Sequence, residues 1–379
     1  MSTSDATPLA VIRCLVYNHK PYLRDCLEGF VMQQTDFPFV AVVHDDCSTD
    51  GSADIIREYA EKYPHIIKPV FETENQYSKG NGSLARIMAE ACGKYGAKYY
   101  ALCEGDDYWT DPLKLQKQVG YLETHPECSM VSCNCVVKMP DRELRTHEDF
   151  VQAGWAHCNE ERDLTTAEII EEYGRMAHTT GLVYRCELPG MVPKNAQKCS
   201  NGDYKLQLTA ALAGKIHHFS DTMCVYRFMI PGSWNERYKS MGGSARLIPY
   251  IGSFIHMLDV FDEVSQGKFQ KHFRSAQERF ILGQVGNFPS DAKSILKTFG
   301  YILHYGRVFG YRPLTQGLFH RLLLRLCFYP YYPYYGNDLF INPAVSTHYA
   351  DHGAHIALSA FSRELVRIPK RKWGLHQIR

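Results

Sequence analysis

The first 140 residues alternate short apolar runs with longer segments in which apolar residues recur every three or four positions. The apolar runs predict strands at 9–16, 39–43, 66–71, 99–103 and 128–137. The segments between them predict helices over 23–31, 55–63, 84–92 and 111–125. Strands that alternate with helices of this length are typical of a mostly parallel sheet covered on both faces. We therefore predict an α/β, Rossmann-like fold that binds its ligand at the carboxyl ends of the strands.

The pattern changes twice further along the chain. Residues 141–175 are polar and acidic and predict an excursion over the sheet edge, and order resumes over 178–235 with a strand at 222–228. Helical spacing and many aromatic residues characterise the chain from about position 240 onward. We therefore divide the chain into an α/β domain, residues 1–238, and a C-terminal helical, aromatic-rich and basic region, residues 239–379.

Three residues predict helix ends. Asp111, followed by a proline, is placed as the N-cap of one helix. Asp203 is placed as the N-cap of another, which Gly214 ends.

Composition narrows the class of protein. The chain has 379 residues, 45% of them hydrophobic, and a formal net charge of +1, so affinity for nucleic acid is not indicated. The 13 cysteines contain no C-x-x-C pair, which predicts reduced thiols in a cytoplasmic protein. The N-terminal MSTSDATPLAVIRC lacks the pattern of a signal peptide, and no uncharged apolar run of 18 residues predicts a membrane span.

Positive charge gathers near the C-terminus. Residues 292–337 contain no acidic side chain, and apolar helix faces alternate there with arginine and lysine. Two interpretations stay open: contact with an anionic membrane surface at its inner face, or a helical cap on the α/β domain. The cluster YPYYPYY at 329–335 likewise fits a sugar face, a membrane interface or surface packing.

Two predicted strands each end in a pair of aspartates. Asp45 and Asp46 follow one strand in HDDCSTDGS, and Asp106 and Asp107 follow another in CEGDDYW. Parallel strands open on one edge, so four carboxylates are expected to meet there. Carboxylate oxygens select hard cations such as Mg²⁺ or Mn²⁺, which substrate phosphates usually help to bind.

The acidic motifs also have simpler interpretations. A calcium loop that starts at Asp46 would need a glutamate at its twelfth position, where Arg57 stands. Asp50 or Ser52 can cap the following helix, and an acidic turn can be merely solvated. Two matching strand ends favour the metal site.

The order of these motifs resembles family 2 glycosyltransferases with the GT-A nucleotide-diphospho-sugar transferase fold. VIRCLVYNHKPYLRDCL is similar to the opening segment of that family, HDDCSTDGS to its DD-x-S motif, and EGDDYW to its DXD-like motif. The resemblance covers about residues 9–235, and the intervening QYSKGNGSLARIMAEA resembles enzymes of bacterial surface-polysaccharide assembly.

The resemblance implies roles for individual residues. Tyr17 and Asp46 match positions that contact the nucleoside, Asp106 matches an acid near ribose and metal, and Asp107 matches the metal ligand. Asp203 matches the acidic position that serves as catalytic base in the family. A base is needed because an acceptor hydroxyl must lose its proton as the new bond forms. A single base opposite the leaving group implies inversion at the anomeric carbon, which is also the outcome in the family.

Two further residues, Arg227 and His178, each have two possible roles. Arg227 in VYRFMIPGSW matches a family Tyr-Arg strand, and it is expected either to face the donor diphosphate or to form a structural ion pair. His178 lies in a segment that resembles the acceptor-side strand, where a packed histidine is the simpler interpretation. The Q-x-x-R-W signature of processive relatives is absent, so we expect one sugar per encounter.

These observations predict an inverting, metal-dependent hexosyltransferase. It would move a sugar from a nucleoside-diphosphate sugar to a hydroxyl of a saccharide or lipid-linked saccharide. The alternatives are a sugar-nucleotide nucleotidyltransferase, disfavoured because VYNHKPYL has no glycine for a triphosphate loop, and a non-catalytic sugar-nucleotide-binding subunit.

Overall fold

The computed structural model describes residues 7–153, 155, 157–199, 201–233, 235–236 and 244–285. Ten strands form one sheet. They are β1 (Ala10–Val16), β2 (Phe39–Asp45), β3 (Ile67–Phe71), β4 (Tyr99–Leu102), β5 (Tyr108–Trp109), β6 (Cys128–Lys138), β7 (Glu143–Leu144), β8 (Arg162–Leu164), β9 (Val183–Arg185) and β10 (Lys215–Arg227).

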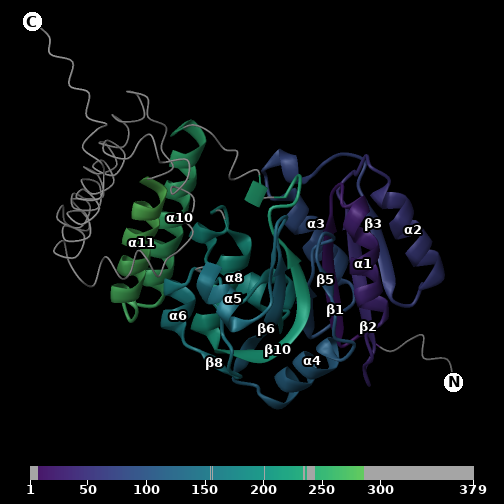
Figure 1. Cartoon of the computed structure of the whole chain (residues 1–379), viewed down its shortest axis with the longest axis horizontal. Coiled ribbons are helices and arrows are strands. Elements are labelled where there is room, and N and C mark those ends of the chain that lie inside the picture. The colour runs from purple at the N-terminus through teal and green to yellow at the C-terminus, as the bar shows by residue number, and fades with distance from the viewer. Residues whose placement is uncertain are drawn as a thin grey trace, which may run out of the picture.

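Helices lie on both sides of this sheet (Figure 1). They are α1 (Lys20–Val31), α2 (Ser52–Lys62), α3 (Ser83–Gly93), α4 (Lys114–Thr124), α5 (His147–Ala153), α6 (Thr166–Glu171), α7 (Leu188–Met191), α8 (Gly202–Ala213), α10 (Ser244–Val264) and α11 (Gln270–Val285). Short 3₁₀ turns add η1 (Tyr77–Lys79), η2 (Thr179–Gly181) and η3 (Lys194–Ala196).

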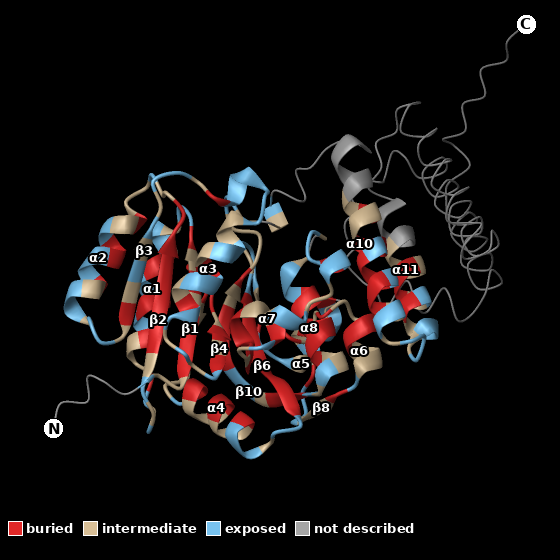
Figure 2. Cartoon of the chain, turned by 180° about the vertical axis from the view of Figure 1, so that it is seen from behind, coloured by how far each residue is buried: buried red, intermediate tan, exposed pale blue. Residues whose placement is uncertain are grey.

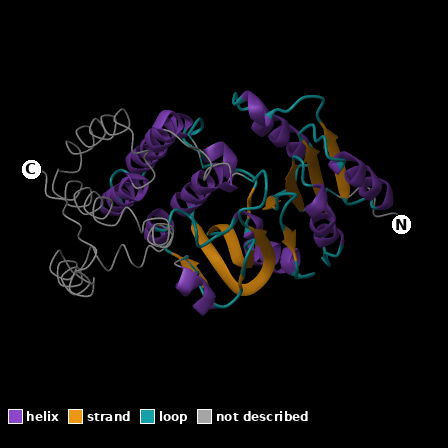
Figure 3. Ribbon diagram, turned by 45° about the horizontal axis from the view of Figure 1, so that its top comes forward, coloured by secondary structure: helices purple, strands orange, loops and turns teal. Residues whose placement is uncertain are grey.

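The strand order is β3-β2-β1-β4-β9-β6-β10-β5, with β7 beside β6 and β8 beside β10. The six strands β3, β2, β1, β4, β6 and β10 run in one direction, whereas β5, β7, β8 and β9 are short and antiparallel to their neighbours. Figure 3 shows the curled sheet in orange between purple helices. The pairing of β10 with β6 contains register shifts along its length. The predicted mostly parallel α/β class is confirmed.

Strands β1 and β2 are largely buried on both faces, as their continuous apolar runs predict (Figure 2). Ile12 and Cys14 of β1 belong to the core cluster that includes α1 and α2, whereas Val11 packs with residues of α3 on the other face. Each predicted helix up to residue 125 is present, with boundaries shifted by a few residues.

Two predicted helix caps are wrong. Helix α4 begins at Lys114 because Asp111 Oδ1 accepts the N–H of Leu113 in a turn that precedes the helix. Asn201, at φ 63°, is the N-cap of α8, and Asp203 lies in the first helical turn. Gly214 follows the end of α8 as predicted.

The helices α10 and α11 confirm the expected C-terminal helical region and pack against α6 and α8. Phe254 and Phe261 of α10 and Phe273 of α11 are buried with Tyr204 of α8 in a second core cluster. The boundary at residue 238 stays a prediction. The basic segment, the tyrosine cluster and the tail, all beyond residue 285, lie outside the described residues. No helix among the described residues is both long enough and apolar enough to cross a bilayer.

Candidate active site

The turns that follow β2 and β4 are both fastened to the end of β1. The N–H of Asp46 donates to the carbonyl of Val16 at 2.9 Å, and the N–H of Gly105 donates to the carbonyl of Leu15 at 2.9 Å. The two aspartate pairs therefore lie along one sheet edge, as the sequence predicts. They have different partners there, so the edge divides into two neighbouring parts.

Gly105 is required by this attachment. A Cβ at this position would lie 2.8 Å from Val16 Cγ2, 2.9 Å from His19 Nδ1 and 3.3 Å from the Leu15 carbonyl. The absence of a side chain thus lets the turn after β4, residues 104–107, which we name the acidic turn, approach β1 and α1. This explains the glycine between Glu104 and the aspartate pair.

The first part of the edge is built around Asp46. Its Oδ1 accepts the N–H of Gln76 at 2.7 Å and its Oδ2 accepts the N–H of Tyr77 at 3.0 Å, while the side chain is 3% exposed. The carboxylate therefore holds η1 and its preceding loop against the end of β2. Tyr17, directly after β1, is 44% exposed and leaves an aromatic face at the same edge.

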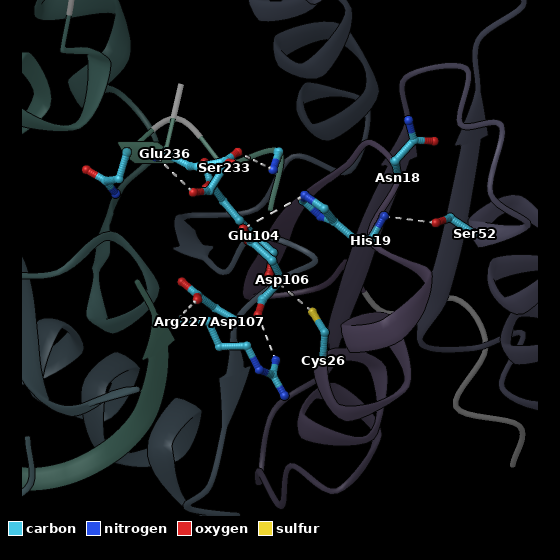
Figure 4. Close-up of polar contacts among 12 residues, drawn as sticks. Asn18, His19, Cys26, Ser52, Glu104, Asp106, Asp107, Arg227, Ser233 and Glu236 are labelled. Atoms are coloured by element: carbon cyan, nitrogen blue, oxygen red, sulfur yellow. Dashed lines mark hydrogen bonds and ion pairs between the residues drawn. The ribbon is translucent and has the colours of Figure 1, made fainter. Parts of the chain in front are cut away.

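The second part of the edge is formed by hydrogen bonds from Arg227, at the end of β10, to the acidic turn (Figure 4). The N–H of Arg227 donates to Asp107 Oδ1 at 2.8 Å, and its Nη1 donates to the carbonyl of Asp106 at 2.7 Å. Nη2 donates to Asp25 Oδ2 at 2.5 Å, and the guanidinium lies 4.5 Å from the ring centre of Tyr108. Arg227 thus forms the structural ion pair that the sequence left open, and its donor-binding role stays a prediction.

Negative charge is concentrated at the acidic turn. Asp106 and Asp107 are 8% and 2% exposed, and Asp106 Oδ1 has no hydrogen-bond partner among the described residues. Burial, then the Asp106 carboxylate, raises the pKa of Asp107 well above its ordinary value, and the Arg227 N–H opposes part of that rise. A bound cation would relieve both the repulsion and the unsatisfied oxygen.

The donor set fits a hard divalent cation. Asp106 and Asp107 offer carboxylate oxygens only, which Mg²⁺ and Mn²⁺ accept, and a site with one or two carboxylates is usually completed by substrate phosphates and water. Among the described residues no group of three or more potential ligands is arranged to hold a metal. The protein would therefore supply part of the coordination shell and the substrate the rest.

Asp203 lies in the first turn of α8. Its Oδ1 accepts the N–H of Tyr204 at 2.8 Å, and its Oδ2 lies 3.4 Å from the hydroxyl of Thr179, which donates to it. The side chain is exposed. Burial, then the charges of Asp106 and Asp203, raise the pKa of Glu104 to about 8.

The sequence assigned no role to Glu104. The residue keeps contact with solvent, and local burial, then the charges of Asp106 and Asp203, raise its pKa. The only signal in the sequence was its place beside the aspartate pair. Its relation to Asp203 could not be inferred, because that residue comes from a distant helix.

Comparisons with known proteins identify the class. The family model described as glycosyl transferase family 2 matches residues 14–230, and the chain belongs to that family. This match agrees with the GT-A fold class.

Curated relatives match over part of their length. An uncharacterized protein of Mycobacterium tuberculosis is 35% identical over 224 residues, which is 59% of this chain and 59% of that protein. An uncharacterized glycosyltransferase of Nostoc sp. is 27% identical, covering 63% of this chain and 73% of that protein. A putative teichuronic acid biosynthesis glycosyltransferase of Bacillus subtilis is 31% identical, covering 30% of this chain and 42% of that protein.

Solved structures show a more distant likeness. TarS 1–349 of S. aureus in complex with UDP-GlcNAc has 16% identity and a TM-score of 0.47, covering 80% of this chain and 88% of that chain. A mannosyltransferase of Pyrobaculum calidifontis in complex with GDP-Man and Mn²⁺ has 16% identity and a TM-score of 0.48, covering 92% of this chain and 89% of that chain.

Proposed function

We propose that the protein is an inverting, metal-dependent glycosyltransferase. It moves a hexosyl group from a nucleoside-diphosphate sugar to a hydroxyl of a saccharide or lipid-linked saccharide in surface-polysaccharide assembly. The observation that carries the proposal is the buried pair Asp106 and Asp107 after β4, with Asp106 Oδ1 unsatisfied among the described residues, in a chain of glycosyl transferase family 2.

The donor lies along the edge formed by β1, β2 and β4. The exposed ring of Tyr17 faces the nucleoside base, and Asp46 fixes the loop that bounds the base pocket. Asp106 lies near the ribose, and Asp107 with Asp106 would hold a divalent cation beside the diphosphate. Such a cation offsets the charge that develops on the departing diphosphate.

Asp203 acts as the base. Its exposed carboxylate accepts the proton of the acceptor hydroxyl while that oxygen attacks the anomeric carbon. The diphosphate leaves toward the acidic turn on the opposite side, so attack and departure are in line and the configuration inverts. The Arg227 hydrogen bond holds Asp107 in place during this step.

The test begins with donor identification. Thermal stabilisation by UDP- and GDP-sugars with Mn²⁺ would select the donor, and proton NMR of the product would give the anomeric configuration. Asp203→Asn is expected to reduce transfer by about a hundredfold or more while donor stabilisation is retained. Asp54→Asn, an exposed acid in the first turn of α2, is the matched control and should leave transfer unchanged. Transfer that survives Asp203→Asn would overturn the assignment of the base.

We also propose, separately, that the C-terminal region binds a membrane surface. This proposal is based on the charge and apolar pattern of the sequence alone. Residues 292–337 combine arginine and lysine with apolar positions and lack acidic residues. Sedimentation with anionic liposomes would compare the full chain with a 1–290 truncation. Equal, negligible binding would leave only the packing interpretation.

A further inference from the structure

Four half-buried rings contact one another in sequence, and we name this group the aromatic wall: Trp155, His178, Tyr226 and Phe228. Trp155 lies 4.8 Å from Phe228 and 6.0 Å from His178 between ring centres, and His178 lies 5.1 Å from Tyr226. The rings come from β10 with the residue after it, from the residue before η2, and from the segment after α5. Aromatic rings that keep solvent exposure are candidates for ligand contact.

The wall adjoins the catalytic groups at both ends. Tyr226 directly precedes Arg227, whose N–H is bonded to Asp107, and burial, then Asp107, Glu104 and Asp106, raise the pKa of the Tyr226 phenol. At the other end, His178 directly precedes Thr179, which donates to Asp203. The wall therefore runs between the acidic turn and the proposed base.

Polar atoms on the wall suit a ligand with hydroxyl groups. His178 Nε2 is buried and has no hydrogen-bond partner among the described residues. Burial lowers the pKa of His178 to about 4, so the imidazole is neutral near pH 7 and can either accept or donate through that atom. The Tyr226 hydroxyl accepts from Asn235 Nδ2 at 2.6 Å and keeps its own proton for another acceptor.

We propose that the aromatic wall is the subsite for the acceptor's pyranose ring. The C–H face of the sugar packs on Trp155 and Tyr226, and His178 Nε2 bonds one of its hydroxyls, which orients the attacking hydroxyl toward Asp203. The inference rests on the proposed function and extends it to the acceptor. The donor is assigned elsewhere, because Tyr17 and Asp46 belong to the ends of β1 and β2.

The proposal commits to a sugar ring over a hydrocarbon chain. A hydrocarbon would leave His178 Nε2 without a partner in a buried position, which costs free energy, whereas a hydroxyl satisfies it. Aromatic faces combined with a few polar atoms are the usual lining of a site for small polar ligands.

The test uses the full chain and two kinds of probe. Saturation-transfer NMR would measure binding of methyl β-D-glucopyranoside, methyl α-D-mannopyranoside and methyl N-acetyl-β-D-glucosaminide, and of octyl β-D-glucopyranoside below its micelle concentration. Trp155→Leu keeps apolar bulk but removes the ring face, and His178→Gln keeps a polar side chain of different shape. Tyr95→Leu, a half-buried aromatic that follows α3 outside the crevice, is the matched control.

We expect saturation of the sugar ring protons in the wild type. Trp155→Leu should weaken binding about tenfold, His178→Gln should raise the KM for the saccharide with little change in kcat, and Tyr95→Leu should behave as the wild type. Donor stabilisation with Mn²⁺ and slow donor hydrolysis should be unchanged in both wall variants, which also shows that they fold.

Other results separate this inference from the proposed function. Sugar binding that needs the wall, in a protein that transfers nothing, would support the subsite and overturn the activity. Transfer with unchanged saccharide KM in both wall variants would overturn the subsite and leave the activity standing. Saturation confined to the octyl chain, or no binding of any pyranoside, would also overturn the subsite.

Discussion

The backbone N–H of Arg227 donates a 2.8 Å hydrogen bond to Oδ1 of Asp107, and the two residues are 120 positions apart in the sequence. The bond joins the end of β10 to the acidic turn after β4, and the Arg227 side chain reinforces it through the Asp106 carbonyl. It fixes one oxygen of the proposed metal ligand. The same buried carboxylate is held at an electrostatic cost, since burial and the Asp106 charge raise its pKa.

Asp107→Asn should separate function from stability. The amide oxygen can still accept the Arg227 N–H, whereas the charge that would bind a cation is gone. We expect loss of Mn²⁺-dependent donor stabilisation and, without metal, a higher free energy of unfolding at pH 7 than in the wild type. The second effect follows because a carboxylate with a raised pKa is destabilising when ionised.

Thermal melts with and without Mn²⁺ and donor would measure both effects. Asp54→Asn, at an exposed acid, serves as the control for charge removal. If Asp107→Asn retained a Mn²⁺-dependent donor response equal to that of the wild type, its role as metal ligand would be refuted.

Changes at Asp25 and Arg227 should distinguish a structural arginine from a donor-binding one. The Asp25 side chain is 58% exposed, so Asp25→Asn is expected to cost at most about 1 kcal/mol of stability. Arg227→Met removes the bond to the buried Asp106 carbonyl and the contact with Tyr108, and should cost about 3 kcal/mol. Urea denaturation measures both.

Donor affinity supplies the second comparison for this pair. With a structural arginine, Asp25→Asn should leave the donor Kd unchanged, and Arg227→Met should weaken it only to the extent that the acidic turn moves. An Arg227→Met variant with wild-type stability and a donor Kd raised more than about tenfold would instead indicate direct contact with the diphosphate.

Gly105→Ala should disturb the site through packing alone. The new Cβ would meet Val16 and His19 below 3.0 Å, so the acidic turn or its neighbours must shift, at a cost of about 1–3 kcal/mol. The displaced aspartates should bind Mn²⁺ with donor more weakly. Gly120→Ala in α4, where a Cβ meets nothing within 4 Å, should instead stabilise the protein by about 1 kcal/mol. Equal stability for both variants would show that the close approach at Gly105 is unimportant.

The long strands and helices of the first half were predictable because their apolar patterns extend over many residues. β5 and β7 were missed because each has two residues, too few for a pattern to show. The aspartate pairs were visible in local motifs. By contrast, the Arg227–Asp25 pair spans 202 positions, and the wall joins three separate segments, so neither could be inferred from local sequence. The wrong cap at Asp111 arose because a carboxylate that caps a turn resembles one that caps a helix.

Neutral histidines in partly and fully buried positions should make the folded state less stable in acid. Burial lowers the pKa of His157 to about 4, with His147 and His178 adding to the effect, and burial also lowers the pKa of His218 to about 4. A histidine whose pKa is lower in the folded state contributes stability above about pH 6.5, its unfolded value, and loses it as pH falls toward 4.

His157→Phe isolates one of these groups, because the phenyl ring can keep the stacking on Phe150, whose ring centre lies 4.3 Å away. Raised carboxylate pKa values at Glu104 and Asp107 act in the opposite direction, so the difference between variant and wild type is the useful quantity. Below pH 6.5 the variant should gain stability relative to the wild type by up to about 1.4 kcal/mol per pH unit. Urea denaturation at pH 7, 6 and 5 checks this. A difference that stays constant with pH would mean that His157 is protonated equally in the folded and unfolded states.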